Sequence, residues 1–161
     1  MPTEPPDSQA QRVALQRWLG QHPELRVIAV FAALPGEVDL AELVVSHPQC
    51  CWVYPRVTGS SLVFHVVENP RVQLVAGAFG IHEPASHLAE IPLERIDAFL
   101  CPGLGFDPHG GRLGRGHGYY DRMLAGARAD ALKVGVCFPY QKVADTFAQA
   151  HDVRMDWVVS G

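Results

Sequence analysis

The sequence has little positive charge and almost no lysine. Its 161 residues include 13 Lys and Arg against 17 Asp and Glu, for a net charge of −4, and its only lysines are Lys133 and Lys142. A surface that binds nucleic acid or an anionic membrane carries an excess of cations. The composition therefore excludes such a role for the surface as a whole, and any anion site has to be local.

Long apolar runs are also missing. The longest, at 27–34 and 96–104, have the length of strands and fall far short of the roughly 20 residues that span a membrane. The first residues, MPTEPPDSQ, contain neither the basic nor the apolar region of a signal peptide. Three of residues 1–7 are proline. We expect no membrane association, a disordered lead-in at 1–7 and a single domain over 8–161.

Cysteine is present without the spacing of a metal site. Cys50, Cys51, Cys101 and Cys137 all lie within apolar runs. Such cysteines are typical of buried, reduced thiols in a reducing compartment. The sequence therefore predicts a cytoplasmic protein.

Strand-like and helix-like segments alternate along the chain. Strands are expected over 26–34, 50–57, 62–67, 97–104, 132–138 and 156–160, and helices over 8–19, 38–45 and 119–129, with a short helix after 138 and a loop-like segment over 77–95. Asp7 or Ser8 can cap the first helix, and a turn at 58–60 makes a hairpin of two strands. Nearly continuous β-branched runs are typical of strands covered on both faces. The pattern predicts a three-layer α/β/α fold with a largely parallel sheet and a ligand site at the carboxyl ends of its strands.

Glycines cluster between a predicted buried strand and the predicted helix at 119–129. Seven of the 15 glycines lie between Gly103 and Gly118. Glycine lets backbone N–H groups approach a ligand, and a helix N-terminus favours anions. Arg112 and Arg115 in the same loop can neutralise phosphate charge. The loop is not a Walker A motif, because no Gly-Lys-Ser/Thr follows, and a merely flexible glycine-rich loop is the alternative interpretation.

The same loop resembles a family signature. The pattern F-D-x-x-G-x-R-L-G-x-G-x-G-Y-Y-D at 106–121 is similar to that of the 5-formyltetrahydrofolate cyclo-ligases, or 5,10-methenyltetrahydrofolate synthetases. Supporting pieces follow the family's order at 37–39, 54–56, 80–84, Gln141, 151–152 and 156–157. The resemblance implies the NagB/RpiA/CoA-transferase-like fold, shared with sugar-phosphate isomerases and acyl-CoA transferases. It also implies use of Mg-ATP to convert 5-formyltetrahydrofolate into 5,10-methenyltetrahydrofolate with release of ADP and phosphate, by a monomer or weak homo-oligomer.

The resemblance also implies roles for particular residues. The ATP-binding residues would be Arg112, Leu113, Gly114, Arg115, Gly116, His117, Gly118, Tyr119 and Tyr120, with Arg115 and Tyr119 catalytic; Ala32, Glu37 and Tyr119 would bind the folate, and Asp121 and Asp152 would hold Mg²⁺.

Position alone leaves simpler interpretations open for the acids. Asp121 can be a first-turn acid favoured by the helix dipole, Asp152 a turn residue, and Glu37 an exposed acid at a helix start. His109 and His117 have no partner at metal-ligand spacing, which favours solvated loop histidines or phosphate donors.

Two departures from the family pattern bear on activity. Family members usually begin with a helix carrying Lys-x-x-x-Arg, which has no counterpart ahead of the first predicted helix here, and Leu40 stands where the family often has threonine. Three functions therefore stay open: an active cyclo-ligase, a relative that binds folate or nucleotide without efficient turnover, and a different enzyme on the same architecture.

Overall fold

The computed structural model describes residues 7–150 and 152–161, so residues 1–6 of the predicted lead-in lie outside the described residues. The α-helices are α1 (Gln9–Gly20), α2 (Ala41–Ser46), α3 (Pro70–Gln73) and α4 (Tyr119–Ala125), and short 3-10 turns are η1 (Ala78–Gly80), η2 (Leu93–Arg95) and η3 (Pro139–Gln141). The strands are β1 (Val27–Ala29), β2 (Cys51–Thr58), β3 (Ser61–Val66), β4 (Leu74–Ala76), β5 (His82–Pro84), β6 (Glu90–Ile91), β7 (Ala98–Cys101), β8 (Gly105–Phe106), β9 (Arg112–Leu113), β10 (Leu132–Val136) and β11 (Trp157–Val159).

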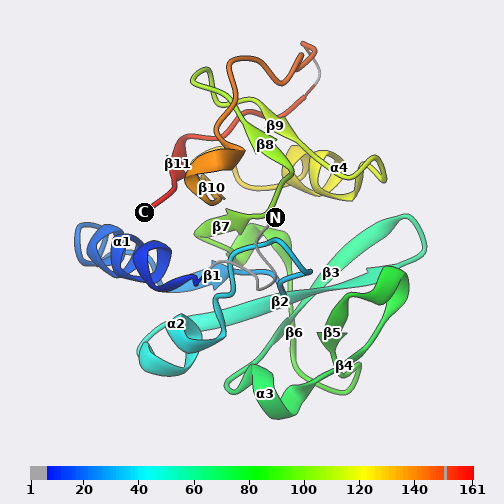
Figure 1. Cartoon of the computed structure of the whole chain (residues 1–161). Coiled ribbons are helices and arrows are strands. Elements are labelled where there is room, and N and C mark those ends of the chain that lie inside the picture. The colour runs from blue at the N-terminus through cyan, green and yellow to red at the C-terminus, as the bar shows by residue number, and fades with distance from the viewer. Residues whose placement is uncertain (1–6, 151) are drawn as a thin grey trace.

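Seven strands form the central sheet, in the order β11-β10-β7-β1-β2-β3-β6. The pairs among β11, β10, β7, β1 and β2 are parallel, whereas β3 and β6 join antiparallel. The small sheets β4–β5 and β8–β9 lie beside this sheet (Figure 1). The predicted largely parallel α/β sheet is confirmed.

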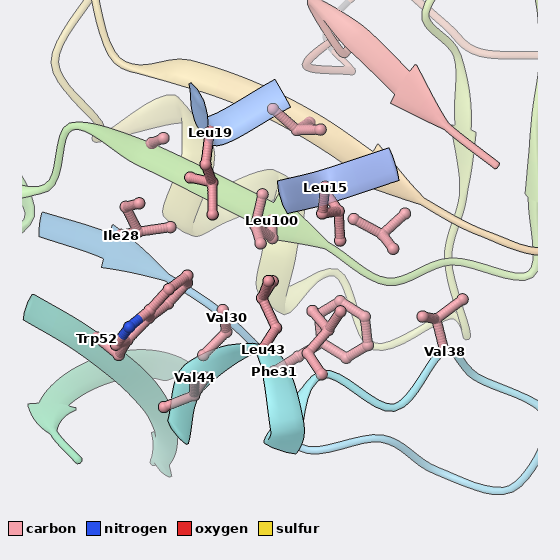
Figure 2. Close-up of a cluster of buried hydrophobic side chains, with 14 of the residues drawn as sticks. Leu15, Leu19, Ile28, Val30, Phe31, Val38, Leu43, Val44, Trp52 and Leu100 are labelled. Atoms are coloured by element: carbon pink, nitrogen blue, oxygen red, sulfur yellow. The ribbon is translucent and has the colours of Figure 1, made fainter. Parts of the chain in front are cut away.

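Helices cover both faces of the sheet. On one face, Leu15 of α1 and Leu43 of α2 pack with Ile28 and Leu100 of the strands (Figure 2). On the other face, the buried side of α4 packs in a second cluster that includes Phe99. Burying a side chain such as Leu15 stabilises the fold by about 1.5–3 kcal/mol relative to leaving it exposed. The three layers thus follow from apolar stripes on helices that meet a sheet apolar on both faces.

Local signals set where most elements begin. The Asp7 carboxylate accepts a hydrogen bond from the Gln9 N–H at 2.8 Å at the start of α1. Ser8 does not cap its own helix; its hydroxyl accepts from the Asp39 N–H at 2.9 Å, which ties α1 to the segment before α2. Asp39 in turn accepts from the Ala41 N–H at 3.0 Å, so α2 begins three residues later than predicted.

The prediction for 77–95 is wrong in part. Strands β5 and β6 and turns η1 and η2 lie within this segment, where only a loop was expected. Strand β5 pairs antiparallel with β4, and β6 pairs with β3. The partner of β6 is distant in the sequence, which a local pattern does not reveal, whereas β4 and β5 form a short local antiparallel pair that the sequence interpretation missed.

The cysteines are all free thiols, but only two are buried as predicted. Cys101 and Cys137 are buried, whereas Cys50 and Cys51 are partly exposed. Burial raises the pKa of Cys101 to about 12 and that of Cys137 to about 11. Within the described part of the chain, no helix is long and apolar enough to cross a membrane.

Candidate active-site cleft at the carboxyl edge of the sheet

A cleft of about 480 Å³ lies at the carboxyl ends of the parallel strands. Its walls come from the segment after β1, the segment after β7, the glycine-rich loop that leads into α4, and the segment after η3. All the residues to which the sequence assigned a role line this one cleft: Ala32, Glu37, Arg112, Leu113, Gly114, Arg115, Gly116, His117, Gly118, Tyr119, Tyr120, Asp121 and Asp152. The structure therefore brings together residues up to 120 positions apart (32 to 152) at the predicted edge.

The glycine-rich loop reaches the cleft through backbone conformations that favour glycine. Gly116 and Gly118 have φ angles of 93° and 71°, and Gly118 is the residue at which the chain enters α4. A residue with a Cβ would be strained at either position. These turns present the loop's backbone to the cleft beside the N-terminus of α4.

Arg115 and Glu37 meet across the cleft. The Arg115 Nε lies 3.4 Å from Glu37 Oε2, and the side chains are 40% and 6% exposed, respectively. The Leu34 N–H donates to Glu37 Oε1 at 2.9 Å, which fixes the carboxylate from the other side. Glu37 is therefore a nearly buried, oriented carboxylate, and the alternative of an exposed acid at the start of a helix is wrong.

Arg112 is held more firmly than Arg115. Its Nη1 donates to the Pro102 carbonyl at 2.9 Å, and its guanidinium carbon lies 5.1 Å from the centre of the Tyr120 ring. Its buried Nε has no hydrogen-bond partner among the described residues. Arg112 thus keeps a positive charge in the cleft wall while it fixes the loop to the end of β7.

The two tyrosines at the start of α4 differ in their surroundings. Tyr120 packs against the second core cluster, and burial raises its pKa above the ordinary value. Tyr119 lies at the rim, where its hydroxyl donates to the Gly59 carbonyl at 3.4 Å. Phe79 and His117 complete an aromatic group there, with ring centroids 4.3 Å apart. One tyrosine therefore anchors the helix and the other is available to a flat ligand.

The two acids predicted to hold metal both line the cleft. Asp121 is in the first turn of α4, and Asp152 Oδ2 accepts from the Gln149 N–H at 2.7 Å. Within residues 7–150 and 152–161, no group of three His, Cys, Asp or Glu side chains could hold a metal ion.

Some cleft residues were missed by the sequence interpretation. Phe79 and Phe147 line the cleft, are exposed, and are the non-glycine residues of the described chain with positive φ, at 60° and 56°. Their neighbours in the sequence carry no pattern that predicts this position. Thr146 also lines the cleft and was missed for the same reason.

Asp107 was part of the quoted motif but received no role. Its Oδ1 accepts from the N–H groups of His109 and Gly111, each at 2.9 Å, and its Oδ2 accepts from the Thr146 N–H at 3.0 Å and hydroxyl at 2.6 Å. The Thr146 hydroxyl contributes most to holding the pKa of this carboxyl well below its usual range, and the backbone N–H groups contribute further. Asp107 is 5% exposed, so it is a buried carboxylate with four donors.

Fold and cleft together define an α/β protein with a loop rich in glycine and arginine at the carboxyl edge of a largely parallel sheet. The chain belongs to the 5-formyltetrahydrofolate cyclo-ligase family, whose model matches residues 3–161. It is 32% identical to the 5-formyltetrahydrofolate cyclo-ligase of Escherichia coli K12 over 60% of this chain, and spans 56% of the length of that relative.

Solved structures agree over more of the chain. The NMR structure of Aquifex aeolicus 5,10-methenyltetrahydrofolate synthetase matches with a TM-score of 0.79 and 32% identity, covering 93% of this chain and 76% of that one. The Mycoplasma pneumoniae 5,10-methenyltetrahydrofolate synthetase matches with a TM-score of 0.75 and 27% identity, covering 94% and 83%.

Proposed function

We propose that this protein uses ATP and Mg²⁺ to convert 5-formyltetrahydrofolate into 5,10-methenyltetrahydrofolate, with release of ADP and phosphate. The observation that carries the proposal is one cleft lined by every residue to which the family resemblance assigned a role. In this reaction the γ-phosphoryl group passes to the formyl oxygen, N10 attacks the formyl carbon, and phosphate leaves. Such chemistry needs positioning and charge neutralisation more than a protein nucleophile.

The contact between Arg115 and Glu37 supports this assignment. The reaction requires the γ-phosphate of one substrate to reach the formyl group on N5 of the other. Arg115 is proposed to neutralise the phosphate, and Glu37 to accept hydrogen bonds from N–H groups of the pterin. Because these side chains are 3.4 Å apart, ligands bound to each would meet in the same part of the cleft.

Asp121 and Asp152 fit a magnesium ion by their chemistry. Both residues line the cleft and carry carboxylate oxygens, the ligand type that Mg²⁺ prefers. Mg²⁺ commonly takes one or two protein carboxylates and completes its coordination with water and substrate phosphates, so a third protein ligand is not required. When bound, the ion would neutralise phosphate charge during transfer.

The decisive measurement is the rise in near-ultraviolet absorbance of the methenyl product when the purified protein meets Mg-ATP and 5-formyltetrahydrofolate. We expect the rise to depend on ATP, and to be lost in Glu37→Gln. The matched control is Glu68→Gln, which changes an exposed acid that does not line the cleft and should leave the rate unchanged. No absorbance change, with calorimetric binding of Mg-ATP and folate retained, would overturn catalysis and support a binding role instead.

A further inference from the structure

Two segments of the cleft wall contain little regular structure of their own. The loop at 107–118 holds only the two-residue strand β9, and the described residues of the segment at 142–152 contain no helix or strand. The first carries Arg112 and Arg115, and the second carries Asp152. A single β-bridge between Phe106 and Lys142 joins the starts of the two segments, and beyond it contacts other than secondary structure have to fix their relative positions.

The Asp107 carboxylate connects these segments. One oxygen accepts from two N–H groups in the turn just before Arg112, and the other accepts from the backbone and hydroxyl of Thr146. The Met155 N–H also donates to the Gly110 carbonyl at 2.7 Å, so the turn is tied to the chain beyond Asp152 as well.

The turn at 109–111 approaches the neighbouring segments too closely for a side chain at its glycines. A Cβ built on Gly111 would lie 2.3 Å from Asp107 Oδ2 and 2.1 Å from the Thr146 hydroxyl oxygen. On Gly110 it would lie 2.5 Å from the Met155 carbonyl oxygen. Both glycines in this turn are therefore required by the closeness of the two segments, in addition to any role in binding a ligand.

We propose that Asp107 is a positioning residue, which holds the arginine-bearing loop and the Asp152-bearing segment at the separation that Mg-ATP requires. The inference rests on the proposed function, because that function gives the two segments a shared ligand. Asp107 does not contact substrate; it acts through the turn at 109–111 and through Thr146. The consequence is a selective defect: loss of the carboxylate disturbs the Mg-ATP side of the cleft, whereas Glu37 keeps its bond to the Leu34 N–H and binds folate as before.

The chain offers a matched control in Asp97. This carboxylate accepts from the N–H groups of Arg26 and Val27, each at 2.9 Å, and from Arg128 at 3.1 Å. Like Asp107, it joins distant segments and has a lowered pKa. Burial acts to raise the pKa of this carboxyl, but hydrogen bonds from the N–H groups of Val27 and Arg26 act chiefly to lower it, and the net shift is downward. It lies before β7, at the opposite edge of the sheet from the cleft, so Asp97→Asn removes a comparable set of hydrogen bonds without touching the cleft.

The test compares Asp107→Asn, Asp97→Asn, Thr146→Val and Thr146→Ser by calorimetry with Mg-ATP and, separately, with 5-formyltetrahydrofolate. We expect Asp107→Asn to weaken Mg-ATP binding about tenfold to a hundredfold, the loss expected when one charge-assisted phosphate contact is broken, with folate affinity retained. Thr146→Val should share the defect, and Thr146→Ser, which keeps the hydroxyl, should restore it. Asp97→Asn should lower only the melting temperature.

Normal Mg-ATP affinity in folded Asp107→Asn, or an equal loss in Asp97→Asn, would overturn the inference. If Asp107→Asn does not fold, normal Mg-ATP affinity in Thr146→Val decides against it in the same way. A parent chain that binds Mg-ATP but forms no methenyl product would overturn the proposed activity alone.

Discussion

At the scale of single residues, Arg115 and Arg112 show how two arginines of one loop come to differ. Arg112 is fixed by a carbonyl and an aromatic face, whereas Arg115 is 40% exposed and makes one long contact with Glu37. Because Arg115 is well exposed to solvent and its contact with Glu37 is long, the pair contributes only about 0.2–1 kcal/mol to stability and holds Arg115 weakly. Its charge is therefore available to a ligand in the cleft.

We predict that Arg115→Ala weakens ATP binding about tenfold or more at low ionic strength, because a charge-assisted hydrogen bond is worth about 1.5–3 kcal/mol. The difference from the parent chain should shrink at high salt, where phosphate contacts are screened. Calorimetry at two salt concentrations measures both effects, with Arg17→Ala, an exposed arginine outside the cleft, as the control. Equal ATP affinity of mutant and parent at low salt would remove Arg115 from the phosphate site.

Asp107 also gives the fold a specific dependence on pH. Its pKa in the folded protein lies below the ordinary value of 3.8, so its contribution to stability is present above that value and is lost as the pH falls towards the folded pKa. We predict that Asp107→Asn lowers the free energy of unfolding by about 1–3 kcal/mol at neutral pH. The difference from the parent should stay constant between about pH 5 and 8 and shrink below about pH 4. Denaturant titrations across this range provide the measurement, and a difference that persists unchanged at the lowest pH would contradict it.

At the scale of elements, the sequence predicted the strands best where both faces are buried. The predicted strands at 26–34, 97–104 and 132–138 are found as the shorter β1, β7 and β10, because a strand covered by helices on two sides must be apolar at nearly every position. The end of α4 was predicted four residues too late. Gly126 ends the helix, and the chain then turns so that Arg128 bonds with Asp97 and Asp130. These tertiary contacts override a local pattern that would otherwise continue the helix.

The first turn of α4 carries a prediction about metal. If Asp121 and Asp152 position Mg²⁺, Asp→Asn at either residue should weaken magnesium-dependent nucleotide binding while the fold stays intact. An Asp121 that only complements the helix dipole would instead contribute about 0.3–1 kcal/mol to stability and nothing to binding. Titrating ATP with and without Mg²⁺, alongside thermal melts, separates these roles. If a variant has a lowered melting temperature and unchanged Mg-ATP binding, the substituted aspartate has only a structural role and does not position Mg²⁺.

At the scale of the whole molecule, the sequence predicted the cleft where its residues share one motif. The stretch from Arg112 to Asp121 is contiguous, so its chemistry could be recognised locally. Phe79, Thr146 and Phe147 reach the same cleft only through the folded sheet, and no spacing in the sequence connects them to the loop. Glu37 lies between these cases, since its position after a buried strand was visible but its burial against Arg115 was not.

Because the cleft joins segments that are far apart in the chain, its ligands should stabilise the whole domain. A ligand at a hundred times its Kd adds about 2.7 kcal/mol to the free energy of unfolding. For a domain of this size that corresponds to a rise in Tm of about 5–10 °C. We predict such a rise with Mg-ATP and, independently, with 5-formyltetrahydrofolate, with Glu37→Gln losing only the folate shift and Asp152→Asn losing only the Mg-ATP shift. Thermal melts with each ligand alone measure both arms. Loss of both shifts in either variant, with the unliganded Tm unchanged, would show that Glu37 and Asp152 do not each act on one ligand alone.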